Sequence, residues 1–172
     1  FQIPFEEKVI FLDQPNTTAE ISKFSPSLKV PCLMVDDQSV WDSLSIMEFL
    51  NESFPQKQMW PKDKLIRAMA RSYASEMHSG FQALRTNLPM KVKERFPGFD
   101  YSVAQVDIDR ISQMWTEVLT KFKGPYLFGE FSIADCMFAP VAFRFQTYGV
   151  KLSPICKAYV QTMLESTHMR DW

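Results

Sequence analysis

The first part of the chain alternates between extended and helical patterns of apolar residues. Residues 5–12 (FEEKVIFL) end in a β-branched, apolar run that favours a strand, and residues 17–24 (TTAEISKF) have the spacing of a short helix. Residues 31–35 (PCLMV) and 39–41 (SVW) flank a short polar turn and predict a β-hairpin. Apolar residues recur at helical spacing directly after the hairpin. We therefore predict a strand, a helix, a hairpin and a second helix in this part.

The remainder of the chain is patterned as helices only. Its longest apolar stripe predicts one continuous helix of about six turns. This stripe consists of Ile66, Ala70, Tyr73, Met77, Phe81, Leu84 and Leu88. Residues 106–122 predict another helix, and Ser132 with Asp135 forms a capping box that begins a third, with Gly149 placed to close it. A further helix is predicted to start at Ser153-Pro154.

The change in pattern suggests two domains. Residues 55–62 contain two prolines and several polar residues and lie between periodic segments, as a linker does. We predict a small α/β domain in residues 1–54, a linker in residues 55–62 and an all-α domain in residues 63–172. The chain opens on Phe1 without a Met, and we expect that the α/β domain is incomplete.

Composition and cysteine spacing give no sign of a nucleic-acid-binding, membrane-spanning or metal-binding protein. The chain is 46% apolar and 23% charged with a net charge of −1, which gives no reason to expect a nucleic acid or an anionic membrane as partner. No apolar run approaches the roughly 18–20 residues of a membrane span. Cys32, Cys136 and Cys156 are too scattered for a disulfide framework, and no His/Cys cluster suggests a metal site. We expect a reduced, cytoplasmic setting and no metal.

Pro31 stands at the start of the first hairpin strand, where a backbone donor would ordinarily join the ladder. A trans proline is tolerated at the first residue of an edge strand and needs no ligand. A cis Val30-Pro31 bond would instead leave the backbone N–H and carbonyl of Val30 to pair with an extended peptide. The pattern alone leaves both possibilities open.

Asp42-Ser43 stands where the next helix begins. Either residue commonly caps its own helix. The same place also attracts a carboxylate, through free amides and the helix dipole, and a neighbouring aspartate suits an ammonium group. The pair could thus hold an α-amino acid end. Because the hairpin brings this corner close to Pro31, one ligand could contact both.

Three motifs together resemble one family. The Val30-Pro31-Cys-Leu strand, the Asp42-Ser43 helix start and the Ser132-Ile-Ala-Asp135 box are similar, in order and separation, to the cytosolic glutathione transferase superfamily, in a bacterial-type form. The resemblance covers essentially the whole chain. It implies a thioredoxin-like N-terminal domain that binds glutathione and an all-helical C-terminal domain that supplies most of the second-substrate pocket.

The resemblance also implies a glutathione site. Val30, before a cis Pro31, would pair with the cysteinyl backbone of glutathione, and Asp42 and Ser43 would hold its γ-glutamyl end. Lys29 occupies the position at which a Gln or Lys of family members often binds the glycine carboxylate of glutathione. The Ser132/Asp135 box would be a folding-related cap.

The resemblance also has implications for residues outside the glutathione site. The resemblance assigns Phe81, Leu84, Arg85 and Leu88 to the second-substrate pocket, and Glu76 to a contact across a dimer. The polar face that includes Arg85 could equally be solvated surface. The family's thiol-activating residue would lie before Phe1, with the first strand and first helix. No residue here is assigned that role, and Cys32 is expected to be a buried strand residue.

We therefore expect an enzyme that conjugates the glutathione thiolate to a small electrophile, or a related glutathione-dependent isomerase or reductase. The resemblance implies glutathione as co-substrate, a homodimer and a role in detoxification. One alternative is a non-catalytic glutathione-binding or assembly module of the same fold. Another is a helical scaffold in which Pro31 and Ser43 are only structural.

Overall fold

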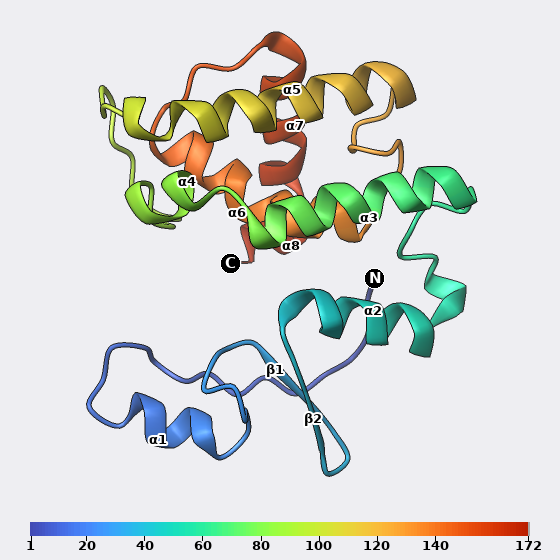
Figure 1. Cartoon of the computed structure of the whole chain (residues 1–172), viewed down its shortest axis with the longest axis vertical. Coiled ribbons are helices and arrows are strands. Elements are labelled where there is room, and N and C mark those ends of the chain that lie inside the picture. Colours follow the sequence, from blue (N-terminus) through green and yellow to red (C-terminus); the bar gives the residue numbers. More distant parts are fainter. Residues whose placement is uncertain (172) are drawn as a thin grey trace. The chain divides into compact units, whose positions relative to one another are not determined.

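The structure is a computed structural model, and it describes residues 1–171. The chain divides into two compact units (Figure 1). Unit 1 runs from Phe1 to Met59, and unit 2 begins at Trp60. The segment 55–62 includes this boundary and contains a short 3₁₀ turn, η1 (Pro55–Lys57).

Unit 1 contains one hairpin and two helices. Its elements are α1 (Thr17–Ser22), β1 (Cys32–Val35), β2 (Gln38–Trp41) and α2 (Ser43–Ser53). The strands pair antiparallel, with Cys32 opposite Trp41 and Val35 opposite Gln38. The turn between them is tight, and Asp36 adopts a φ of 51°, which an aspartate tolerates better than most residues do. The predicted hairpin and the two predicted helices of this unit are confirmed.

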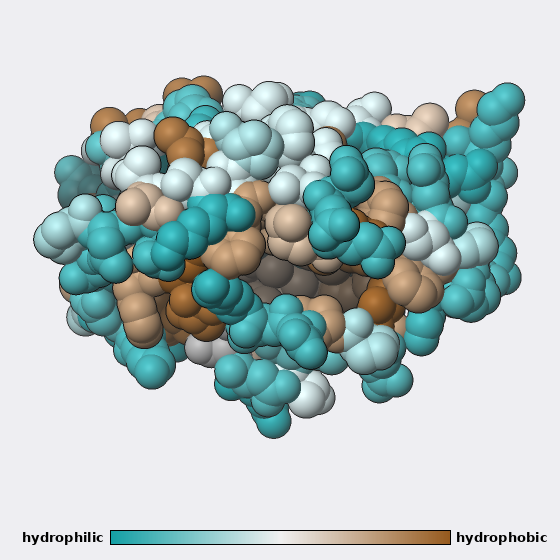
Figure 2. Space-filling view, turned by 90° about the horizontal axis from the view of Figure 1, so that it is seen from below, coloured by the Kyte–Doolittle hydropathy of each residue, from teal (hydrophilic) through white to brown (hydrophobic). Residues whose placement is uncertain are grey.

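The strand predicted for residues 5–12 is wrong. This segment is irregular, and the sheet of the described residues has two strands only, β1 and β2. A strand needs a neighbour for its backbone hydrogen bonds, and an apolar side-chain pattern cannot supply one. Phe5 is 78% exposed and Phe11 76%. Figure 2 shows hydrophobic side chains, in brown, at the surface of the face that it views.

Unit 2 is built from helices, coloured green to red in Figure 1. They are α3 (Lys64–Ser79), α4 (Gln82–Asn87), α5 (Gln105–Phe122), α6 (Ile133–Thr147), α7 (Pro154–Glu165) and α8 (Thr167–Arg170), with a 3₁₀ turn, η2 (Ser102–Ala104), before α5. Helix α6 packs against α3 and α7, and most of its residues are buried. Trp115 of α5 is fully buried beside Phe138 and Phe145 of α6 and Tyr159 of α7, with ring centroids 4.8–5.7 Å away. Among residues 1–171, no helix combines the length and apolar character of a membrane span.

The continuous helix predicted from Ile66 to Leu88 is interrupted. Helix α3 ends at Ser79, Gly80 forms its C-cap, and Phe81 adopts a left-handed φ of 59° before α4 begins. A Cβ on Gly80 would lie 2.7 Å from the backbone oxygen of Glu76, which already accepts the Gly80 N–H. The absence of a side chain therefore permits the chain to turn sharply here, although the apolar stripe continues through the break.

The predicted helix ends of unit 2 are confirmed. Ser132 and Asp135 form the capping box at the start of α6, where the Asp135 carboxylate accepts the Ser132 N–H at 2.9 Å. Gly149 has a φ of 61° after the other end of α6, and the Val150 N–H bonds to the Phe145 carbonyl as in a Schellman motif. Ser153 caps α7, with Pro154 as its first residue.

Candidate functional site

The open end of the hairpin brings the two singled-out motifs together. Because Cys32 pairs with Trp41, the next residues outward, Pro31 and Asp42, lie at the same end of the two strands. The Val30-Pro31 peptide bond is cis, as the resemblance implied. Val30 is 47% exposed although it is apolar. This end of the hairpin is therefore a corner where a strand start and a helix start face the same space.

The backbone of Val30 is unpaired. Within residues 1–171, neither its N–H nor its carbonyl makes a hydrogen bond. An exposed N–H and C=O pair at the edge of a sheet is the group that an extended peptide pairs with. Val30 can therefore offer an added peptide one donor and one acceptor.

Asp42 is the N-cap of α2 and has an unusual backbone. Its Oδ1 accepts the amides of Leu44 at 3.0 Å and Ser45 at 3.4 Å, so the capping alternative is confirmed. Its φ is 73° with ψ 127°, a conformation that costs a non-glycine residue about 1–3 kcal/mol. Such strained residues cluster at binding sites, where the surrounding structure holds them in place. The cap does not exclude a ligand, since the carboxylate stays at the start of the helix.

Ser43 and Lys29 have unused hydrogen-bonding capacity at the same corner. Ser43 is the first residue of α2, so its N–H has no partner in the helix, and its hydroxyl makes no hydrogen bond with residues 1–171. Lys29 is exposed and makes no ion pair within these residues. An amide and a hydroxyl at a helix N-terminus, with a lysine beside Val30, are suited to bind carboxylates.

The thiol of Cys32 has a hydrogen-bond partner within its own unit. Cys32 is half-buried, and its thiol lies 3.3 Å from the Phe24 carbonyl, to which it donates. Within residues 1–171, no group of three or more His, Cys, Asp or Glu side chains is arranged to hold a metal ion.

The residues predicted for a second-substrate pocket lie mostly inside unit 2. Leu84 and Leu88 are fully buried, and Phe81 is 7% exposed. A fully buried side chain presents no surface to a substrate, so both leucines have a packing role here. Arg85 is half-buried, and its guanidinium donates to carbonyls at the end of α3. The assignment of these residues to a pocket stays a prediction.

Glu76 has a partner within its own chain. Its carboxylate oxygens accept hydrogen bonds from Nε of Arg110 at 2.7 Å and from Nη2 of Arg110 at 2.9 Å. The two residues thus form a bidentate ion pair between α3 and α5. The hydrogen bond from Arg110 holds the pKa of Glu76 below its ordinary value. The predicted contact across a dimer would have to compete with this pair.

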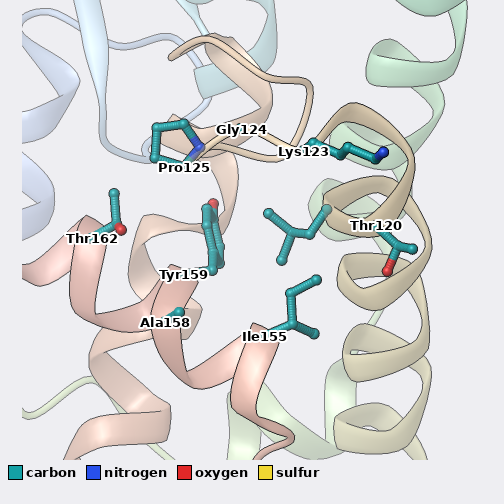
Figure 3. Close-up of a pocket in the computed structure, with 9 residues that line it drawn as sticks. Thr120, Lys123, Gly124, Pro125, Ile155, Ala158, Tyr159 and Thr162 are labelled. Atoms are coloured by element: carbon teal, nitrogen blue, oxygen red, sulfur yellow. The ribbon is translucent and has the colours of Figure 1, made fainter.

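Two hollows in unit 2 contain none of the predicted site residues. One hollow has a volume of about 360 Å³. Figure 3 shows that it lies between α7, which contributes Ile155 and Tyr159, and the end of α5, near Thr120 and Lys123. Its lining is mostly apolar, and the Tyr159 hydroxyl is bonded to Asp135. The other, of about 370 Å³, lies around the loop before α5. The second hollow is the more polar of the two, since Asp100, Ser102 and Lys151 are among the residues that line it.

Comparison with known proteins decides the family. Residues 1–53 match the family model described as "Glutathione S-transferase, N-terminal domain", and residues 68–162 match the one described as "Glutathione S-transferase, C-terminal domain". The chain belongs to the glutathione S-transferase family. The family resemblance stated from the sequence is thereby confirmed.

Among the relatives of this glutathione transferase are several isomerases. A probable maleylacetoacetate isomerase of Caenorhabditis elegans is 29% identical over 156 residues, which cover 88% of this chain and 72% of the relative. The maleylacetoacetate isomerase of Mus musculus is 31% identical, over 80% of this chain and 63% of the relative. The chain thus spans part of the length of each.

Solved structures confirm the fold. A glutathione transferase homologue from Burkholderia, crystallised with bound glutathione, has a TM-score of 0.74 at 22% identity and covers 99% of this chain and 82% of its own. The holo structure of maleyl pyruvate isomerase, a bacterial zeta-class member, also has a TM-score of 0.74, at 21% identity, over 98% of this chain and 84% of its own. The predicted fold class, a thioredoxin-like unit followed by a helical unit, is confirmed.

Proposed function

We propose that this glutathione transferase binds glutathione at the open end of its hairpin. The observation that carries the proposal is the unused hydrogen-bonding capacity of three neighbouring groups, the Val30 backbone, Ser43 and Lys29. Glutathione is a short peptide with a carboxylate and an ammonium at its γ-glutamyl end and a second carboxylate on its glycine. Its charges and its backbone match the corner group by group.

The match assigns each residue a role. Val30, beside Pro31, pairs with the cysteinyl N–H and carbonyl, as an added strand would. The Ser43 amide and hydroxyl donate to the γ-glutamyl carboxylate, where the helix dipole also favours negative charge. Asp42 accepts from the γ-glutamyl ammonium, and Lys29 meets the glycine carboxylate.

We further propose that the bound thiol reacts with a small electrophile. A thiol with a pKa of about 8.5 is mostly protonated at neutral pH, and a hydrogen bond donated to its sulfur increases the thiolate fraction. The thiolate forms a C–S bond with the electrophile. In conjugation a leaving group departs, whereas in isomerisation the C–S bond breaks again after rotation about the neighbouring carbon–carbon bond. The isomerase relatives support the second outcome.

The remaining expectations concern assembly, location and physiological role. A homodimer, a cytoplasmic location and a role in detoxification follow from the family resemblance alone. Within the described residues, the Glu76–Arg110 pair lies on exposed parts of α3 and α5, where a second copy could dock. These stay predictions.

Activity measurements test the reaction. Thioether formation from glutathione and a chloronitroaromatic, and isomerisation of a cis-enone diacid such as maleylacetoacetate, are followed by absorbance. We expect Ser43→Ala to raise the KM for glutathione about 10–100-fold, because a hydrogen bond to a charged group contributes about 1.5–3 kcal/mol. Ser45→Ala is the matched control, since Ser45 is exposed on the same helical turn, and its KM should be unchanged.

The outcomes separate the alternatives. An unchanged KM in Ser43→Ala would contradict the assigned site. Saturable glutathione binding without turnover of either substrate would favour the non-catalytic module of the same fold. A folded protein that binds no glutathione would leave only the structural roles of Pro31 and Ser43.

A further inference from the structure

The second hollow of unit 2 lies between a loop and the end of a helix. Phe99, Asp100 and Tyr101 of the loop before α5 line it, and so do Gly149 and Lys151, which follow α6. Its volume of about 370 Å³ is within the range of small-molecule sites, roughly 300–1,000 Å³. None of its lining residues belongs to the glutathione corner.

The walls of the second hollow are fixed to each other. The Tyr101 hydroxyl accepts the Lys151 N–H at 3.1 Å, which ties the loop to the segment after α6. The Phe99 ring packs against the ring of Tyr148, the buried C-cap of α6, with centroids 4.8 Å apart. Because the loop is held in place by these contacts, a ligand would find a formed site and would not have to order it.

Part of the lining is aromatic and accessible. Phe99 is 38% exposed although it is apolar, and Tyr101 and Tyr148 line the same hollow. Aromatic side chains bind flat apolar groups through stacked or edge-to-face contacts. This part of the hollow therefore suits a large apolar side chain.

The hollow also contains two opposite charges that do not pair with each other. Asp100 and Lys151 both line it, and within residues 1–171 neither makes an ion pair. Asp100 accepts the Ser102 N–H at 2.9 Å, and hydrogen bonds from Ser102 hold the pKa of Asp100 below its ordinary value. Asp100 is therefore ionised at neutral pH, and its charge remains available to a cation.

Two donors are available near each other on the other side of the charge pair. The ammonium of Lys151 donates to no group within residues 1–171. The Tyr101 hydroxyl, which accepts the Lys151 N–H, has no acceptor for its own hydrogen among these residues. An ammonium and a hydroxyl together suit a carboxylate.

We propose that the second hollow binds a free α-amino acid with a large apolar side chain. The ammonium of the amino acid pairs with Asp100, its carboxylate accepts from Lys151 and Tyr101, and its side chain lies against Phe99. A zwitterion satisfies both charges of the hollow, whereas a simple anion or cation leaves one of them unpaired. The site does not depend on the proposed function, because it needs neither glutathione nor the second substrate.

Calorimetric titration of the chain with tryptophan, in the absence of glutathione, tests the proposal. We expect saturable binding of tryptophan. Tryptamine, which lacks the carboxylate, and indole-3-propionate, which lacks the ammonium, should each bind at least threefold more weakly. These two analogues keep the indole ring, so they measure the recognition of each charge by itself.

Variants of the two charged residues test the assigned positions. Lys151→Gln and Asp100→Asn should each weaken tryptophan binding about three- to tenfold, since each removes one charged partner at a partly exposed site. Asparagine keeps a side-chain oxygen for the Ser102 N–H. Lys157→Gln is the matched control, because Lys157 is an exposed lysine of α7 that does not line the hollow, and its affinity should be unchanged. Thermal unfolding shows that the variants are folded.

Amide hydrogen exchange locates the ligand, since bound tryptophan should slow exchange in residues 98–102. Four results would overturn the site: no saturable binding by the folded wild type, wild-type affinity in Lys151→Gln, an analogue that binds as tightly as tryptophan, or slowed exchange only outside residues 98–102 and 148–151. A parallel glutathione titration separates this proposal from the proposed function. Tryptophan binding without glutathione binding would contradict only the glutathione corner, and the reverse would contradict only the amino acid site.

Discussion

Asp135 shows how one side chain can serve more than the helix that it caps. It is fully buried, and its carboxylate accepts the Ser132 N–H and hydroxyl, the Leu127 N–H at 3.0 Å and the Tyr159 hydroxyl at 3.1 Å. Burial raises its pKa to about 6, because this effect exceeds that of the hydrogen bonds, which lower the pKa. At neutral pH the carboxyl is therefore mostly ionised and can accept from all of these donors.

This geometry predicts unequal costs for the two halves of the capping box. Asp135→Ala leaves the Leu127 N–H and the Tyr159 hydroxyl unpaired in the core, at about 1–3 kcal/mol each, in addition to the lost cap. Ser132→Ala loses about 1 kcal/mol. Urea denaturation at pH 7 measures both free energies of unfolding. Equal losses would show that Asp135 acts only as a helix cap.

At the scale of elements, the sequence pattern and the structure predict opposite changes in stability for Gly80→Ala, because the structure has a break between α3 and α4. In a continuous helix, Gly80→Ala would stabilise the protein by about 0.5–1 kcal/mol, because glycine is a poor helix former. In the structure, the new Cβ would lie 2.7 Å from the Glu76 carbonyl. We expect Gly80→Ala to destabilise the protein by about 1–3 kcal/mol.

Chemical denaturation measures this change, and Ser79→Ala serves as the control. Ser79 is the exposed neighbour of Gly80, and its replacement should change the free energy of unfolding by no more than about 0.5 kcal/mol. An increase in stability in Gly80→Ala would contradict the need for a glycine at the turn.

Local signals in the sequence predicted elements more reliably than they predicted tertiary surroundings. The hairpin, the α6 capping box and Gly149 follow from residues close together in the chain, and the structure confirms them. Residues 5–12 have a strand-like pattern, but strand formation depends on a partner that a local pattern does not reveal. The apolar stripe continued through Gly80, because side-chain periodicity does not record a change in backbone direction.

The candidate site residues also differ in whether a local sequence signal identifies them. Asp42 and Ser43 could be singled out because a helix start is a local feature, and the structure places them at one corner with Pro31. Lys151 was missed. Its only local signal is a single charge in the run YGVKL, and its place in the same hollow as Asp100 emerges only after folding.

At the scale of the whole molecule, the two units differ in how their polar groups are engaged. Unit 1 offers a backbone, a helix start and a lysine, which suit a peptide with charged ends. Unit 2 holds the guanidinium groups of Arg85 and Arg144 on backbone carbonyls of its own helices.

The most direct test of the glutathione corner is calorimetric titration of the chain with glutathione, comparing the wild type with Asp42→Asn. Asparagine keeps the side-chain oxygen that caps α2 but removes the charge proposed to meet the γ-glutamyl ammonium. Asp42→Ala removes both and should also lose about 1 kcal/mol of stability. We predict that the free energy of unfolding of Asp42→Asn lies within about 0.5 kcal/mol of the wild-type value. The same variant should bind glutathione about 10–100-fold more weakly. Equal affinity in the wild type and Asp42→Asn would contradict the proposed site.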